Sequence, residues 1–166
     1  LQVISSLLNL QSNYVIDDNS KLLFKETQNR IKTLALVHEK LYKSDDVEYV
    51  NLKDYVVSIV ELLSYSFDKE YIDIEYDFDE ITKIDIEKAI PCGLITNEII
   101  SNSFKYAFPK KIVGRIDIKL RNKGNDYVLT ISDNGVGMPE DIDVRSSKSL
   151  GLELINALVG QLEGQL

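Results

Sequence analysis

The chain has 166 residues, and its 44% hydrophobic and 28% charged residues are typical of a soluble globular protein with one large or two small domains. Its 19 Lys and Arg residues against 27 Asp and Glu residues give a net charge of −8, which argues against a nucleic-acid-binding surface. One cysteine excludes an internal disulfide, and no apolar run approaches the roughly 18–20 residues that cross a bilayer. We therefore expect a cytoplasmic chain without nucleic-acid or membrane contacts, whether a longer parent protein is soluble or membrane-anchored.

The first 43 residues carry two helical patterns. Apolar residues from Leu1 onward recur at spacings of three and four, which predicts an amphipathic helix from residue 1 to about 16. After a polar turn at 17–20, a heptad-like stripe follows at Phe24, Thr27, Ile31, Leu34, His38 and Leu41. Two such helices bury little by themselves. We therefore expect a helical hairpin that dimerises through residues 1–43 as a four-helix bundle.

The pattern changes after a short polar linker near residues 44–48. Periodicity then predicts a helix over 51–66, a strand over 72–78, a long helix over 86–107, a hairpin over 115–133 and a helix over 150–160. This order of elements is typical of a two-layer α/β sandwich with a mixed sheet. The expected fold class is α+β, with the helical hairpin preceding the sandwich.

The long helix carries the first group of residues with a chemical pattern. At 100° per residue, Glu98, Asn102 and Lys105 lie within roughly a 60° arc of the helix. An acid, an amide oxygen and a cation in this arrangement could hold a hydrated Mg²⁺ and neighbouring phosphates. The alternative is a solvated helix face with an ordinary charge pair.

Two further motifs follow the hairpin. Asp133-Asn134-Gly135-Val136-Gly137-Met138-Pro139 could turn sharply around a flat ligand, with Asp133 accepting a hydrogen bond from an exocyclic amine; the alternative is a glycine-rich turn. Ser146-Ser147-Lys148-Ser149-Leu150-Gly151-Leu152 begins the last helix, where free N–H groups and a lysine attract anions; the alternative is a serine N-cap. Residues 139–148 between them could form a mobile lid.

The order and spacing of these motifs resemble the ATP-binding domain of the GHKL superfamily (gyrase, Hsp90, histidine kinase, MutL). Asn102 matches the N-box asparagine, Asp133-x-Gly135-x-Gly137 matches the G1 box, and Ser149-Leu150-Gly151-Leu152 looks like a short G2 box. The resemblance covers residues 50–166 and implies the Bergerat ATP-binding fold. It departs from the superfamily in lacking a separate phenylalanine-rich box and in having a short lid, and the final strands expected after Gly164 are missing.

The front of the chain narrows the resemblance to sensor histidine kinases whose phosphoacceptor motif reads His-Arg-Val-Lys-Asn-Asn. The similar segments are residues 1–11, 37–42 and 89–98. The resemblance implies a dimerisation and phosphotransfer segment over 1–46 and a catalytic ATP-binding domain over 47–166. The phosphoacceptor histidine is expected just before Leu1, so we expect this fragment not to autophosphorylate.

The same resemblance implies an activity, cofactors and partners. The protein would use ATP and Mg²⁺ to phosphorylate a histidine and then pass the phosphoryl group to an aspartate of a response-regulator receiver domain. An upstream sensor domain would be present in the parent protein. Two alternatives are a GHKL serine kinase of the anti-sigma type and a degenerate phosphotransfer or scaffold protein that no longer binds ATP.

Individual roles are implied residue by residue. Asn102 would coordinate Mg²⁺, Glu98 would act as a polarising base or an outer-shell group, and Lys105 would meet a phosphate. Tyr106 would pack near adenine or ribose, and Asp133 would accept from the adenine amine. The remaining positions would shape the adenine pocket (Gly135, Gly137, Met138) or bind the phosphate tail (Lys148, Ser149, Leu150, Gly151, Leu152).

His38 is the only histidine of the chain. Its neighbours resemble the second dimerisation helix of the family rather than the phosphorylation motif, and it follows Ile31 by seven residues within the apolar stripe. We therefore predict a structural or helix-capping role for His38, at a packing position, rather than phosphorylation.

Overall fold

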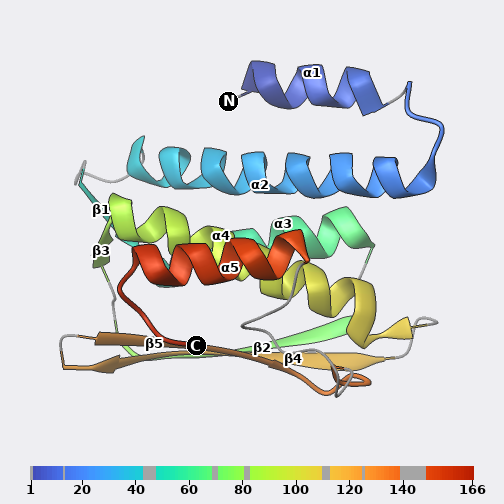
Figure 1. Ribbon diagram of the computed structural model, residues 1–166. Coiled ribbons are helices and arrows are strands. Elements are labelled where there is room, and N and C mark those ends of the chain that lie inside the picture. The colour runs from blue at the N-terminus through green and yellow to red at the C-terminus, as the bar shows by residue number, and fades with distance from the viewer. Residues whose placement is uncertain are drawn as a thin grey trace.

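A computed structural model describes residues 2–12, 14–42, 48–68, 71–80, 83–109, 113–124, 126–138 and 149–166 (Figure 1). Its helices are α1 (Gln2–Ser12), α2 (Asp18–Tyr42), α3 (Leu52–Phe67), α4 (Ile86–Asn102), the π-helix η1 (Ser103–Ala107) and α5 (Leu150–Gln161). Its strands are β1 (Tyr49–Asn51), β2 (Ile72–Phe78), β3 (Lys83–Asp85), β4 (Gly114–Lys123) and β5 (Asp126–Asp133). The α+β class is confirmed.

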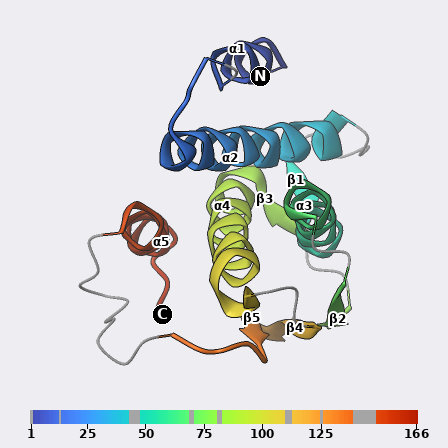
Figure 2. The same ribbon diagram turned by 90° about the vertical axis from the view of Figure 1, so that its right-hand side faces the viewer.

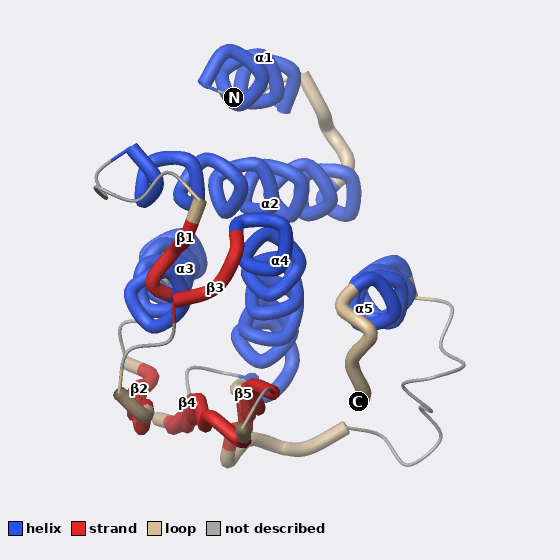
Figure 3. Tube along the Cα trace, turned by 90° about the vertical axis from the view of Figure 1, so that its left-hand side faces the viewer, coloured by secondary structure: helices blue, strands red, loops and turns tan. Residues whose placement is uncertain are grey.

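The elements are stacked in layers. Helix α2 lies between α1 and the rest of the molecule, and α3 and α4 lie between α2 and the sheet of β2, β4 and β5 (Figures 1 and 2). Helix α5 lies beside α4, which it contacts (Figure 3). The long helix α4 is therefore in contact with α2, α3 and α5. Residues on α4 can reach groups from all three neighbouring helices.

The larger sheet is mixed, as the sequence predicts. Its strand order is β2-β4-β5, with β2 parallel to β4 and β4 antiparallel to β5. On β4, Ile116, Ile118 and Leu120 are buried against the helices. The predicted hairpin is confirmed, with Gly124 at φ 70° in the turn, a conformation that glycine adopts without a steric penalty.

Helix α3 follows its sequence pattern closely. The side chain of Asn51 accepts a hydrogen bond from the Asp54 amide and so caps the first turn. Asp68 ends the helix in a left-handed conformation. The buried face consists of the apolar residues at spacings of three and four: Leu52, Tyr55, Val56, Ile59, Val60 and Leu63. This face forms much of the hydrophobic core.

Helix α2 differs from the prediction in which face is buried. Asn29, Thr33 and Val37 are at most 1% exposed, while His38 is exposed. The buried positions lie roughly 130° around the helix axis from the predicted apolar stripe. The packing position predicted for His38 is therefore wrong, because the turn that carries it buries Val37 instead. Helix α2 packs on α3 and α4 through a partly polar face.

Helix α1 buries little of its apolar surface. Val3, Ile4, Leu7 and Leu10 are between 50% and 72% exposed. The helix ends at Ser12, earlier than the predicted residue 16. Within the described part of the chain, no helix combines the length and the apolar character that a membrane span requires.

Candidate active site

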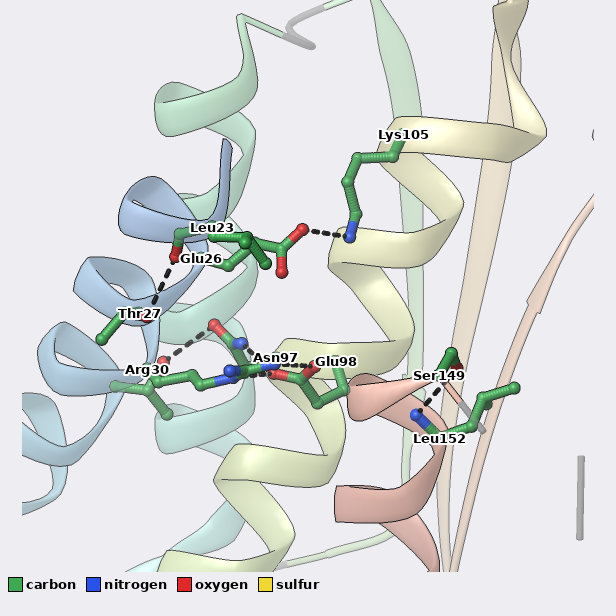
Figure 4. Close-up of polar contacts among 10 residues, drawn as sticks. Leu23, Glu26, Thr27, Arg30, Asn97, Glu98, Lys105, Ser149 and Leu152 are labelled. Carbon is green, nitrogen blue, oxygen red and sulfur yellow. Dashed lines mark hydrogen bonds and ion pairs between the residues drawn. The ribbon is translucent and has the colours of Figure 1, made fainter. Parts of the chain in front are cut away.

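Glu98 is the most enclosed charged group of the predicted site. Its side chain is 7% exposed, and both carboxylate oxygens accept hydrogen bonds from Arg30 of α2, with Nε–Oε1 and Nη2–Oε2 distances of 2.8 Å each (Figure 4). The Asn97 side-chain amide also donates to Oε1, at 2.9 Å. These hydrogen bonds to Glu98 hold the pKa of Arg30 above its usual value. Such a bidentate pair fixes the orientation of the carboxylate.

Lys105 is held by α2 in the same way. Its Nζ lies 2.8 Å from Glu26 Oε1, and the two side chains are 13% and 15% exposed. Lys105 belongs to the π-helix η1, which continues α4 and interrupts the single long helix predicted over 86–107. The predicted shared face of Glu98 and Lys105 agrees with their contacts, since both residues meet side chains of α2 (Figure 4).

Asn102 ends α4 between these two residues and is half-buried. No hydrogen bond joins its side chain to another group among the described residues, so its amide oxygen is available to a ligand. Across the described ranges, no group of three or more His, Cys, Asp or Glu side chains could hold a metal ion. Mg²⁺ commonly binds through one or two protein oxygens together with substrate phosphates, and Asn102 suits that mode.

Asp133 stands at the end of β5, next to the end of α4. One carboxylate oxygen accepts a hydrogen bond from Ser103 Oγ at 2.8 Å, and the other accepts one from the Gly135 amide at 3.1 Å. Because Ser103 directly follows Asn102, this bond brings the glycine motif to the end of the helix that carries Asn102. The first two predicted motifs therefore meet in space.

Gly135 and Gly137 of this motif are each favoured over other residues for a different structural reason. A Cβ on Gly135 would lie 2.4 Å from the Ala107 carbonyl oxygen, to which the Val136 amide donates a hydrogen bond at 3.0 Å. Gly135 is thus needed for the close approach of this loop to η1. Gly137 has a φ of 79°, which disfavours other residues. Nearby, Tyr106 and Met138 are 64% and 56% exposed, so their side chains are accessible to a ligand.

The start of α5 completes the group of elements around Glu98. Ser149 caps this helix by accepting a hydrogen bond from the Leu152 amide at 3.4 Å. A Cβ on Gly151 would lie 3.0 Å from Glu98 Oε2. Glu98 therefore lies between Arg30 and the first turn of α5 (Figure 4). Lys148 and the predicted lid over 139–148 lie outside the described residues.

Three residues of this region were missed by the sequence analysis: Glu26, Arg30 and Ser103. Glu26 and Arg30 are spaced i, i+4 beside the buried polar residues Asn29 and Thr33. The polar stripe that flanks the apolar stripe of α2 was the sequence signal that could have indicated these two residues. Ser103 gave no signal of its own, because its role depends on where β5 ends.

Other features lie away from these residues. A cavity of about 650 Å³ is lined by Ser12, Val15, Ile16, Lys21, Lys25, Gln28 and Ser66, at the α1–α2 turn. Burial raises the pKa of the Cys92 thiol to about 11, which is typical of a small core residue rather than a redox site.

Sequence families divide the chain in two. Residues 1–67 match the family described as "Histidine kinase", and residues 87–166 match "Histidine kinase-, DNA gyrase B-, and HSP90-like ATPase". Over both segments the chain is similar to histidine kinases. The match over 87–166 includes Glu98, Asn102, Lys105 and Asp133.

Individual relatives agree with this assignment. The chain is 26% identical over 171 residues to "Sensor histidine kinase PdtaS" of Mycobacterium tuberculosis, covering 100% of this chain and 33% of that protein. It is 24% identical to "Blue-light-activated histidine kinase 2" of Erythrobacter litoralis, covering 100% of this chain and 49% of that protein. The chain thus spans between a third and a half of the length of these relatives.

Solved structures show the same fold. The histidine kinase domain of the Erythrobacter litoralis EL346 blue-light activated histidine kinase superposes with a TM-score of 0.73 at 20% identity, covering 95% of this chain and 74% of that one. A second structure, of the EL346 blue-light activated histidine kinase, gives a TM-score of 0.77 at 23% identity over 89% of this chain and 51% of that one. The GHKL ATPase fold expected from the sequence is confirmed.

Proposed function

We propose that this chain is the catalytic core of a sensor histidine kinase that binds Mg-ATP. In the proposed reaction the γ-phosphoryl group passes to a histidine of the dimerisation segment and then to an aspartate of a response-regulator receiver domain. The observation that carries the proposal is the Ser103–Asp133 hydrogen bond, because it joins the helix end bearing Asn102 to the glycine motif. An ATP site of this kind needs both parts together.

Each side chain would act by holding a part of the nucleotide. Asp133 would accept from the adenine amine, while Asn102 would hold Mg²⁺, which neutralises phosphate charge when bound. Lys105 would meet a phosphate, and Glu98 would act as the polarising base. Tyr106, Gly137 and Met138 would border the base, with Lys148, Ser149, Leu150, Gly151 and Leu152 near the phosphates. Phosphoryl transfer needs mainly positioning and charge neutralisation, which these groups provide.

The exposed apolar face of α1 supports the proposed homodimer through residues 1–43. Several apolar side chains of α1 are more than half exposed in the single chain. A second hairpin would cover such a surface in a four-helix bundle. We infer that the assembly is a homodimer which also meets a receiver domain and, in the parent protein, a sensor domain.

The test is a titration of the chain with ATP in the presence and absence of Mg²⁺. We expect Mg-dependent binding that Asn102→Ala weakens roughly tenfold or more, equivalent to at least about 1.4 kcal/mol. Asn122→Ala, in the exposed β4–β5 turn region, is the matched control and should leave the affinity unchanged. Absence of Mg-dependent ATP binding in the unmodified chain would favour the scaffold alternative.

The two alternatives make different predictions from the kinase. A serine kinase of the anti-sigma type has no helical hairpin, whereas residues 1–67 match a histidine kinase family over that region. Phosphorylation of a partner protein on serine, with none on histidine, would favour that alternative. Acid-labile phosphate on the full-length protein would favour the histidine kinase.

A further inference from the structure

Two charged side chains of α2 form ion pairs with two residues of the proposed ATP site. Glu26 and Arg30 are one helical turn apart on α2, and they pair with Lys105 and Glu98, respectively (Figure 4). All four side chains are at most 18% exposed. These pairs are therefore largely enclosed, unlike the Arg115–Glu75 pair on the sheet, whose side chains are about half exposed at 48% and 55%.

The carboxylate of Glu26 pairs with the Lys105 ammonium group, as a phosphate group would. Both groups offer anionic oxygens, and an ammonium group pairs with one or the other as a compact charge. In the observed arrangement the Lys105 Nζ is 2.8 Å from Glu26. A nucleotide phosphate that approaches Lys105 therefore competes with Glu26 for the ammonium group.

Arg30 engages Glu98 in a corresponding way. The guanidinium takes both carboxylate oxygens at 2.8 Å, and Asn97 adds a third hydrogen bond. Both oxygens of this carboxylate already accept hydrogen bonds from Arg30, so a further partner must displace one of them. Glu98 is thus unavailable as a base while Arg30 is in place.

We infer that Glu26 and Arg30 form a latch by which α2 competes with Mg-ATP for the catalytic domain. This inference rests on the proposed function and adds a means of regulating the same site. Because both latch residues lie on one face of α2, a rotation of that helix about its axis would release both pairs together. Docking of α2 on the catalytic domain then lowers the affinity for nucleotide, and bound nucleotide lowers the affinity for α2 by the same factor.

The first experiment measures Mg-ATP affinity of the full chain by titration. Glu26→Gln, which removes the charge facing Lys105, should tighten binding roughly tenfold, within the usual range of coupling between sites. Glu75→Gln removes the same charge from the exposed pair with Arg115 and should leave affinity unchanged. An unchanged or weakened affinity for Glu26→Gln, or an equal gain for Glu75→Gln, would overturn the latch.

The second experiment uses the unmodified chain and so does not depend on a variant folding. Amide hydrogen exchange across Glu26–Thr33 should become faster when Mg-ATP is added, because α2 leaves its site on α4. Exchange that stays the same or slows while nucleotide binds would overturn the latch and leave the proposed function intact. Absence of Mg-ATP binding by both the unmodified chain and Glu26→Gln would instead contradict the proposed function, and the latch with it.

Discussion

Ser103 shows how one small polar residue connects two motifs. It is buried at 7% exposure, and its hydroxyl donates to Asp133, which is exposed. With the Gly135 amide on the other oxygen, the carboxylate has a fixed orientation at the end of β5. In the proposed function this carboxylate recognises an adenine amine, and such recognition benefits from an orientation that exists before the ligand binds.

Ser103→Ala should therefore weaken Mg-ATP binding. We expect a loss of about 1 kcal/mol, or roughly fivefold in affinity, which is below the usual range for a hydrogen bond to a charged group because Asp133 is exposed. The preference for ATP over GTP, measured in parallel titrations, should fall as well. Ser132→Ala on β5 serves as control, and equal affinities for Ser103→Ala and the unmodified chain would contradict the positioning role.

Among the elements, α4 depends on a close contact with α3. Gly93 lies within α4, where glycine normally costs about 1 kcal/mol relative to alanine. A Cβ at this position would lie 2.3 Å from the Tyr55 hydroxyl oxygen. That hydroxyl donates to the Thr33 carbonyl of α2 at 3.0 Å. Tyr55 thus connects three helices, and glycine makes the room for it.

Gly93→Ala should destabilise the protein despite the better helix propensity of alanine. Overpacking against Tyr55 costs typically 1–3 kcal/mol, so we expect a net loss of about 1 kcal/mol in the free energy of unfolding. Gly160→Ala in α5, where a Cβ meets nothing within 4 Å, should instead stabilise by up to about 1 kcal/mol. Urea unfolding of both variants measures the difference, and equal effects would contradict this explanation.

The elements also show what a single sequence can reveal. Helix α3 and the β4–β5 hairpin were predictable because their apolar periods are long and regular. The β1–β3 ladder was not, since each strand has three residues and so offers no period to recognise. The π-helix η1 was hidden too, because it is a change of backbone hydrogen bonding inside an otherwise helical pattern.

The site was predictable only in part for a related reason. Asn102, Asp133 and the glycines stand at local motifs, which spacing along the chain reveals. The contacts of Glu98 and Lys105 come from residues 68 and 79 positions away, and no local pattern encodes them. The polar face of α2 that supplies these contacts was masked by its more conspicuous apolar stripe.

At the scale of the whole molecule, the surface of α1 predicts association. Leu7→Glu places a charge on a side chain that is 55% exposed in the single chain but would be covered in a dimer. We expect the unmodified chain to sediment as a dimer and the variant to shift toward monomer. Val113→Glu, at an apolar position 79% exposed outside α1, is the control. A monomeric unmodified chain at high concentration would contradict the dimer.

The strand order has a consequence for how the sheet assembles. The antiparallel ladder of β4 and β5 joins neighbours in sequence, and such hairpins close in about 1–10 μs. Its parallel neighbour β2 must wait until the intervening segment with α4 has folded back, and this loop closure carries an entropic cost that grows with its length. We therefore expect the β4–β5 hairpin to form first and β2 to pair with it afterwards. During synthesis on the ribosome, β2 is made before its partner β4, and the whole of α4 must be made between them.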